Sequence, residues 1–296
     1  MQGTLVPCAI CAGAETRRVY TKFGWGIERC GRCGLVFANP RAPEEAVLAR
    51  YSSEYFWKEY LPAAGAPEGR VDLELLDAKN RPMLDLIRRH APSGQRLLEV
   101  GTGAGLFLKA AERAGWNASG VELSPEGATF ARDRLGLDVR QERAEAMTFS
   151  PRSFDVAVMF DVIEHLFDPN VVLAATHRAL RPGGLVVINT PNFDALSRQG
   201  LGVNWAVLSP LEHLYYFTER TLRAILRRAG FQRIQFVRRF RGWSVPEAMN
   251  YTYTHAPDGR RARLYGKAVR RWGDASLSLV LRLGRADSLL AVAHRD

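Results

Sequence analysis

From residue 95 onward, short apolar segments alternate with amphipathic ones, and this alternation limits the possible folds more than any other feature of the chain. Strands that alternate with helices build a largely parallel sheet with helices on both faces. We therefore expect an α/β protein with a doubly wound, seven-stranded, Rossmann-like sheet. The expected strands are residues 96–100, 117–123, 138–145, 154–161, 184–192, 231–239 and 288–295.

The turn after the first expected strand is rich in glycine, with the sequence Gly101-Thr-Gly-Ala-Gly105. Glycines let a ligand approach the backbone closely, and Glu122 ends the next strand, where a carboxylate can bind both hydroxyls of a ribose. A dinucleotide fingerprint would have glycine where Leu106 stands, and the acidic Glu99 would repel a pyrophosphate. The pattern therefore favours an adenosine joined to an amino acid over NAD.

All four cysteines lie in the first 33 residues, as the pairs Cys8/Cys11 and Cys30/Cys33. Two C-x-x-C pairs at this separation are typical of a structural zinc site with four thiolates. The alternatives are two disulfides or unrelated free thiols. The chain shows no apolar export signal, so we expect a cytoplasmic protein, in which disulfides are rare.

Four segments resemble the successive motifs of class I S-adenosylmethionine-dependent methyltransferases. They are residues 99–105 (EVGTGAG), 120–126 (GVELSPE), 154–166 (FDVAVMFDVIEHL) and 181–192 (RPGGLVVINTPN). The resemblance covers about residues 95–240 and implies S-adenosylmethionine (SAM) as the cofactor. The cofactor-binding residues that it implies are Glu99, Gly101, Thr102, Gly103, Gly105, Glu122, Leu123, Ala144, Glu145, Phe160 and Asp161.

Each of these implied residues would contact a different part of the cofactor. Glu99 and the glycine turn would hold the methionine end, Glu122 would bind the ribose, and Leu123 would pack on the adenine. The pair Ala144 and Glu145 lies in the loop where the family contacts the adenine amino group, although Glu145 could also be a solvated carboxylate. Phe160 and Asp161 would lie under the cofactor, beside the acceptor.

Methyl transfer requires a base only when the acceptor has to lose a proton. Four polar residues stand where such a base is expected: Asp161, Glu164 and His165 at and just beyond the end of the fourth strand, and His213 after the fifth. An imidazole has a suitable pKa for this task, so His165 or His213 is the candidate general base. The alternative is that His165 packs beside the cofactor and that His213 orders a loop.

A catalytic metal is a further alternative. Asp161, Glu164, His165 and His213 resemble the E-x-x-E-H motif and distal histidine that hold a divalent metal in small-RNA 2′-O-methyltransferases and ubiquinone-pathway O-methyltransferases. The first ligand is Asp here, which is one methylene shorter than the Glu of those groups. We therefore favour transfer without a catalytic metal.

The N-terminal part has its own resemblance. Its four cysteines, the segment CGLVFANPR and an aromatic helix over 43–60 resemble bacterial methyltransferases encoded among glycan and secondary-metabolite biosynthesis enzymes. This implies a small-molecule acceptor: a sugar, a lipid- or carrier-linked intermediate, or a secondary metabolite. The alternatives are an RNA 2′-O-methyltransferase and a catalytically inactive scaffold that only binds the cofactor.

The net charge of +10 is unevenly distributed, because residues 217–296 hold 17 basic and only 6 acidic side chains. We expect helices over 241–285 that form a lid, a homodimer contact or a membrane-surface element, and we regard nucleic acid as an unlikely partner. The expected divisions are a zinc-binding module (1–40), a helical substrate-side segment (41–94), the SAM-binding core (95–240), this insert (241–285) and the last strand (286–296).

Overall fold

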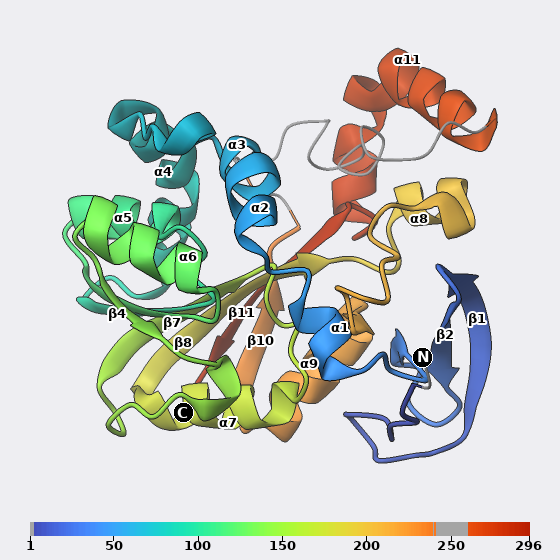
Figure 1. The fold of residues 1–296 in the computed structure, drawn as a ribbon, viewed down its shortest axis with the longest axis horizontal. Coiled ribbons are helices and arrows are strands. Elements are labelled where there is room, and N and C mark those ends of the chain that lie inside the picture. Colours follow the sequence, from blue (N-terminus) through green and yellow to red (C-terminus); the bar gives the residue numbers. More distant parts are fainter. Residues whose placement is uncertain (1–2, 239, 241–259) are drawn as a thin grey trace.

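A seven-stranded sheet forms the centre of the computed structural model, which describes residues 3–238, 240 and 260–296 (Figure 1). The strand order is β10-β11-β8-β7-β4-β5-β6, and β11 runs antiparallel to both of its neighbours. The sheet confirms the predicted doubly wound α/β class. Its strands are β4 (Arg96–Val100), β5 (Asn117–Glu122), β6 (Asp138–Gln141), β7 (Phe154–Phe160), β8 (Leu180–Pro191), β10 (Gln232–Phe236) and β11 (Ser288–His294).

Helices cover both faces of this sheet (Figure 1). One face carries α4 (Leu73–His90), α5 (Leu106–Arg113) and α6 (Pro125–Thr129), which continues as the π-helix η3 (Phe130–Arg134); the other carries α7 (Pro169–Ala179) and α9 (Glu219–Arg228). The Ser124 hydroxyl accepts a hydrogen bond from Gly127 N at 3.2 Å and so caps α6, as the Ser-Pro sequence predicts. Pro82 lies inside α4 without dividing it.

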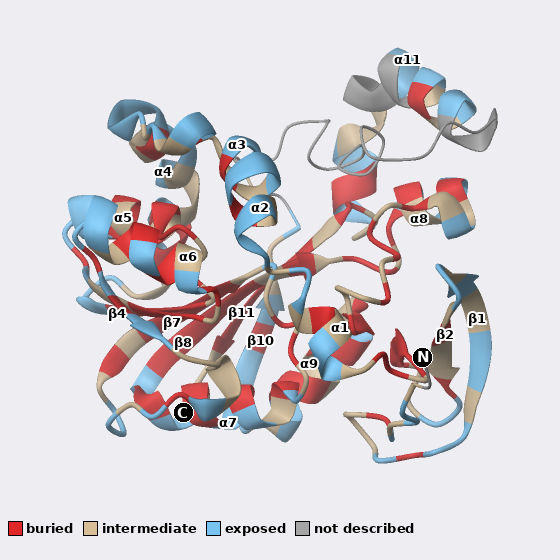
Figure 2. Ribbon diagram, in the orientation of Figure 1, coloured by how far each residue is buried: buried red, intermediate tan, exposed pale blue. Residues whose placement is uncertain are grey.

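Apolar side chains fill both faces, and the central strands are almost entirely buried (Figure 2). Leu97 and Val156 belong to the core under α4 and α5, whereas Leu98 and Ala157 belong to the core under α7 and α9. Burying one such side chain stabilises the fold by roughly 1.5–3 kcal/mol. The near-continuous apolar strands are therefore explained by a sheet that is covered on both sides.

A second, four-stranded sheet joins the N-terminus to a distant part of the chain. It has the order β1 (Thr16–Lys22), β2 (Trp25–Cys30), β3 (Val36–Ala38) and β9 (Tyr215–Tyr216). Sequence analysis placed residue 215 in the SAM-binding core, and it gave no sign of a strand there. The cysteine-containing segment is consequently built into the rest of the molecule along one edge.

Short helices connect the two sheets. They are α1 (Glu44–Leu48), α2 (Ser53–Tyr55), the π-helix η1 (Phe56–Tyr60), α3 (Leu61–Ala64) and the 3-10 helix η2 (Pro67–Gly69). The aromatic helix predicted over 43–60 is thus interrupted around Ser52, which caps α2. Beyond β8, α8 (Leu196–Leu201) and the 3-10 helix η5 (Gly202–Asn204) lead towards β9.

The predicted insert contains one long helix, α11 (Arg260–Arg282), while its residues 241–259 lie outside the described part of the chain. Within α11, Leu264, Trp272 and Leu279 are exposed. Among the described residues, none of the helices has the length and apolarity that a membrane span requires. Contact of this insert with a membrane surface or with a second copy stays a prediction.

Candidate active site

The glycine turn between β4 and α5 has the backbone geometry of a ligand cradle. Gly101, Gly103 and Gly105 all have positive φ, at 74°, 54° and 75°. A Cβ on Gly103 would lie 1.9 Å from the hydroxyl oxygen of Tyr60, and a Cβ on Gly101 would lie 2.5 Å from a methyl carbon of Val162. Conformation and space therefore both require glycine at these two positions.

Glu122, the last residue of β5, is fixed beside this turn. Its Oε2 accepts a hydrogen bond from Gly103 N and its Oε1 accepts one from Ser124 N, both at 2.7 Å. The carboxyl is buried, and burial raises its pKa although the two amide groups oppose that shift. Two backbone amides thus hold the carboxylate in one orientation at the edge of the cradle.

Glu99 lies at the floor of the cradle and lacks a partner for one of its oxygens. The residue is 4% exposed, and its Oε2 has no hydrogen-bond partner among the described residues. Burial and the nearby Glu122 raise its pKa well above the usual range. Because an unpaired buried carboxyl is costly, this position suits a ligand that brings an ammonium group, as the methionine end of SAM does.

Tyr60 covers the cradle from the N-terminal side, a role that sequence analysis did not assign. Its hydroxyl accepts a hydrogen bond from Ala104 N at 3.3 Å, and its ring stacks on Phe56 with centroids 5.6 Å apart. Both residues lie on the π-helix η1, and such helices are frequent at functional sites. The signal available in the sequence is an aromatic pair at helical spacing within the expected helix over 43–60.

The residues implied for the adenine end lie nearby, with varied contacts. Leu123 and Ala144 are half-buried, and Ala144 begins the 3-10 helix η4 (Ala144–Ala146). Glu145 Oε1 accepts a hydrogen bond from Phe167 N at 3.0 Å, so this carboxylate braces the loop after β7. The role of Glu145 towards adenine stays a prediction.

Phe160 is the last residue of β7, and two carboxyl groups, Asp161 and Glu164, follow it in the chain. Phe160 packs edge-on against Phe107, with ring centroids 4.7 Å apart. Asp161 accepts a hydrogen bond from Asn189 Nδ2 at 3.2 Å, and desolvation by the surrounding protein raises its pKa to about 6 although the side chain keeps solvent contact. Glu164 is buried and accepts a hydrogen bond from Thr190 Oγ1 at 2.9 Å.

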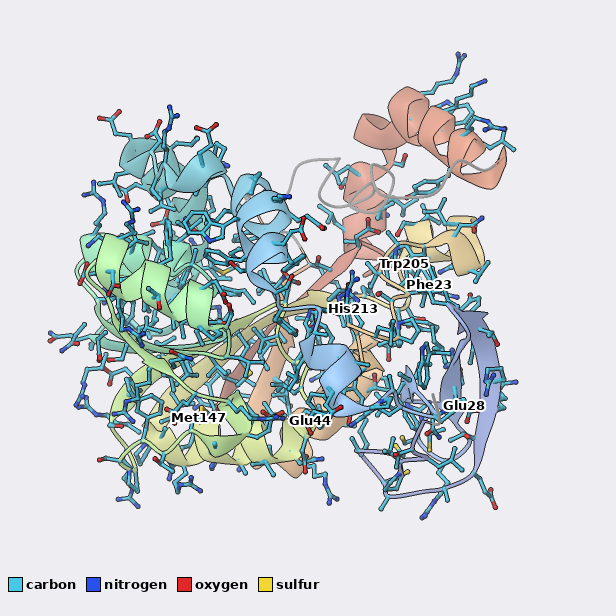
Figure 3. All side chains as sticks on the ribbon, in the orientation of Figure 1. Phe23, Glu28, Glu44, Met147, Trp205 and His213 are labelled. Atoms are coloured by element: carbon cyan, nitrogen blue, oxygen red, sulfur yellow. The ribbon has the colours of Figure 1, made fainter. Side chains whose placement is uncertain are left out.

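The two predicted histidines meet at this edge of the sheet, where Figure 3 labels His213 near the centre of the view. The rings of His165 and His213 are 4.6 Å apart and nearly perpendicular. His165 Nδ1 lies 3.3 Å from the hydroxyl of Tyr51, and His213 Nδ1 lies 2.7 Å from Val207 O, to which it must donate. Burial lowers the pKa of both histidines. The pKa of His165 lies well below its usual value, chiefly through burial and to a lesser extent through the nearby His213.

These histidines can also serve as metal ligands together with Glu164. The ligand atoms of Glu164, His165 and His213 all lie within 4.8 Å of one another. Glu164 Oε1 is buried without a hydrogen-bond partner in the part of the chain that the structure describes, so an acceptor is available. Asp161 does not belong to this group. Of the four residues in the metal alternative, three are brought together.

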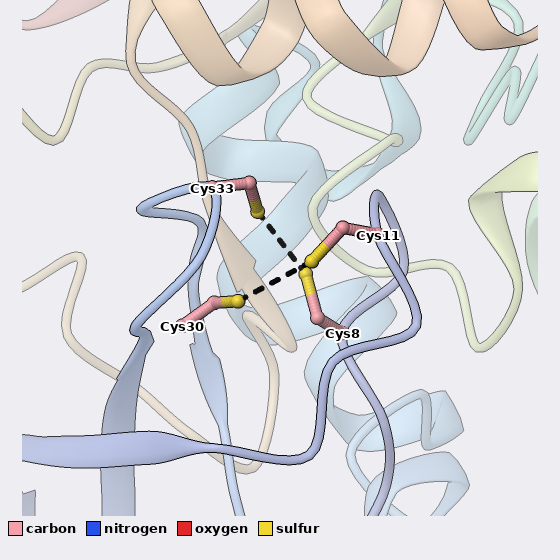
Figure 4. Close-up of side chains that lie close together, drawn as sticks. All are labelled: Cys8, Cys11, Cys30 and Cys33. Carbon is pink, nitrogen blue, oxygen red and sulfur yellow. Dashed lines mark hydrogen bonds between the residues drawn. The ribbon is translucent and has the colours of Figure 1, made fainter.

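The four cysteines, all within the predicted zinc-binding module (1–40), form a second cluster. Their sulfur atoms point towards one another (Figure 4). The Cys8 and Cys33 sulfurs are 3.3 Å apart and those of Cys11 and Cys30 are 3.5 Å apart, and all four thiols are free. Four thiolates about 2.3 Å from one zinc ion would be about 3.8 Å from each other. The cluster therefore fits a closed tetrahedral site and does not form the alternative disulfides, and zinc itself stays a prediction.

Known proteins resemble this chain in sequence and in fold. The profile of a family described as a methyltransferase domain matches residues 74–235. The ubiquinone biosynthesis O-methyltransferase of Methylococcus capsulatus is 36% identical over 133 residues, which make up 43% of this chain and 55% of that protein. Its namesake from Ruegeria pomeroyi is 32% identical over 151 residues, or 47% of this chain and 61% of that protein.

A solved structure, a SAM-dependent methyltransferase from Archaeoglobus fulgidus, shares the fold with a TM-score of 0.53 and 18% identity over 80% of this chain and 100% of that chain. The sheet order, the glycine turn and the acidic end of β5 define a class I SAM-dependent methyltransferase domain. The family match covers more than half of the residues, so the chain belongs to the methyltransferase-domain family. It spans little more than half the length of the curated relatives that it matches.

The raised pKa of Glu99 predicts a pH-dependent affinity for SAM. The ligand's ammonium group pairs only with the ionised carboxylate, so affinity should increase as pH rises through the raised pKa of Glu99 and decrease as pH falls and Glu99 is protonated. Calorimetric titration at several pH values measures this slope. Glu99→Gln should bind SAM at least about tenfold more weakly and lose most of the slope.

Glu112→Gln is the matched control for this prediction, because Glu112 is an exposed residue of α5 that pairs with Lys109. It should bind SAM like the wild type. An unchanged affinity and slope in Glu99→Gln would contradict the assignment of Glu99 to the methionine end.

Proposed function

We propose that this protein transfers a methyl group from SAM to a hydroxyl of a small-molecule acceptor. The observation that carries the proposal is the meeting of His165, His213 and Glu164 at the carboxyl end of β7, beside the cradle formed by the glycine turn and Glu122. A cofactor site next to a group that accepts protons is what O-methylation requires. Both reported relatives carry the name ubiquinone biosynthesis O-methyltransferase, which supports an oxygen acceptor on a small molecule over the RNA alternative.

His213 is the better candidate for the general base. Its Nδ1 donates to Val207 O, so in the neutral ring Nε2 carries a lone pair, and Nε2 has no hydrogen-bond partner among the described residues. His165, in contrast, has its Nδ1 within 3.3 Å of the Tyr51 hydroxyl. We therefore assign proton removal to His213 and orientation of the pair to His165.

The chain's own groups would prepare the reaction in three ways. Glu122 fixes the ribose end, Glu99 fixes the amino end, and the aromatic cover formed by Tyr60 and Phe56 excludes water from the cradle. SAM supplies an electrophilic methyl carbon when bound. The protein then has to orient the acceptor oxygen and remove its proton. Because the cofactor already carries a reactive methyl group, orientation contributes most of the catalytic effect.

A divalent cation is the second candidate at the same place, favoured by the short distances within the Glu164, His165 and His213 group. Such an ion would be held by Glu164 Oε1 and by one nitrogen of each histidine. It would lower the pKa of an acceptor hydroxyl, as bound metals do for water. In that case His213 would act as a ligand and not as the base.

Labelled-methyl transfer tests the proposed function directly. SAM with a labelled methyl group should label hydroxylated small molecules, such as phenols, sugars or lipid-linked intermediates, and leave RNA unlabelled. Label in an RNA fraction would favour the RNA 2′-O-methyltransferase alternative. SAM binding without transfer to any fraction would favour the inactive scaffold.

Replacement of His213 by Asn separates the two candidates for acceptor activation. The amide of Asn can still donate to Val207 O, yet it cannot accept a proton, so kcat should fall about 10²- to 10⁴-fold while the Kd for SAM stays unchanged. In the wild type, the acidic limb of kcat should lie below pH 6.5, because the lowered pKa keeps the imidazole neutral until the pH falls through it.

His177→Asn is the control. His177 lies on α7, and its ring packs against that of Phe231. It should leave kcat unchanged. A second metal ion per chain beyond the cysteine site, with activity that returns only when a divalent metal is added back, would contradict the base mechanism and support the metal one.

A further inference from the structure

The cysteine-containing sheet is hydrogen-bonded to the chain segment that carries His213. In this sheet β3 pairs with β9, so that Val36 lies opposite Tyr216. The backbone amide of Ala38 donates to Leu214 O at 2.9 Å. His213 therefore lies two residues before a strand that is hydrogen-bonded to the N-terminal sheet.

The same segment is tied on its other side to the residue before His165. The amides of Leu214 and Tyr215 both donate to Glu164 O, at 2.8 Å and 3.1 Å. Residues 214–215 thus link β3 to the main chain of Glu164. A shift of β3 would either break these hydrogen bonds or move the histidine pair, because Leu214 and Glu164 are the immediate chain neighbours of His213 and His165.

A buried cation reinforces this link. Arg41, which follows β3 and is 8% exposed, donates to Phe167 O at 2.9 Å and to the hydroxyl of Tyr215 at 2.8 Å. Charge-assisted hydrogen bonds of this kind are stronger than neutral ones. Arg41 consequently joins β9 to the loop after Glu164 a second time, through side chains.

The cysteine cluster contacts the start of β3. Cys30 ends β2, and its amide donates to Leu35 O at 2.9 Å, immediately before β3 begins. Cys8 and Phe37 belong to the same buried cluster as Ile163, which precedes Glu164. The four sulfurs are thus part of the framework behind the histidine pair.

We infer that the metal-loaded cysteine cluster positions His213: it fixes β3, β3 fixes β9, and β9 sets His213 against His165 and Glu164. Cys30, Arg41 and Tyr215 are positioning residues in this scheme and touch neither cofactor nor acceptor. The inference rests on the proposed function for its kinetic consequence, but its structural consequence is independent of any acceptor.

Removal of the cysteine-bound metal tests this inference in the full-length protein. After treatment with a thiol-reactive reagent and a chelator, or in Cys33→Ser, one zinc per chain should be lost. Hydrogen exchange should then accelerate at least about tenfold at the amides of Ala38, Leu214 and Tyr215, while residues 99–105 keep their protection. The Kd for SAM should change less than about twofold, and kcat should fall about 10- to 100-fold.

Tyr215→Phe keeps all four cysteines and removes only the hydroxyl that accepts from Arg41. It should retain zinc and SAM binding, accelerate exchange at residues 214–216 and lower kcat to a smaller extent. Tyr20→Phe is the matched control, because Tyr20 belongs to β1, at the opposite edge of the same sheet from β9, and its hydroxyl accepts from Arg198 on α8. It should leave exchange at 214–216 and kcat unchanged.

Unchanged exchange at 214–216 after complete loss of the metal would overturn the inference, whatever the activity. Exchange that accelerates equally over residues 99–105 would also overturn it, since the cluster would then stabilise the whole fold. If no acceptor is ever methylated, the exchange and SAM-binding measurements still decide the matter, so failure of the proposed function is distinguishable from failure of this inference.

Discussion

The carboxylate of Glu122 connects the two strand ends on which the cofactor site depends. It accepts one hydrogen bond from the turn after β4 and another from the start of α6, and so joins adjacent parallel strands at their carboxyl ends. Ligands of open α/β sheets bind at this edge, because loops and helix N-termini converge there. Glu99 and the glycine turn have their places in the cradle through this connection.

The acceptor side of the site is assembled from three separate parts of the chain. Tyr51 comes from the connection between α1 and α2, His165 from the loop after β7, and His213 from the segment before β9. No single element holds all three, so their arrangement depends on contacts between the two sheets.

The strand ends and the glycine turn around the predicted cofactor site could be predicted from the sequence because their signals are local. Strand periodicity places Glu122 at a strand end, and the glycines mark the turn, with no knowledge of distant contacts. The grouping of the four cysteines could likewise be predicted from their spacing. A proline inside a helix favours a kink or a break, yet α4 continues through Pro82.

The features that sequence reasoning missed all depend on contacts between distant residues. The two-residue strand β9 is too short to have a periodicity, and only its pairing with β3 makes it a strand. Tyr60 lies far from the glycine turn in the chain, so its hydrogen bond to Ala104 could not be inferred. The choice of His213 over His165 likewise needed their hydrogen-bond partners, which the sequence does not specify.

The most direct test of this account is a calorimetric titration of the wild type and of Glu122→Gln with SAM. The account predicts one site per chain in the wild type and an affinity at least about 100-fold lower in the variant, because a neutral amide cannot accept from the ribose hydroxyls and from both backbone amides. Circular dichroism checks that the variant is folded. A folded Glu122→Gln protein that binds SAM as tightly as the wild type would contradict the account.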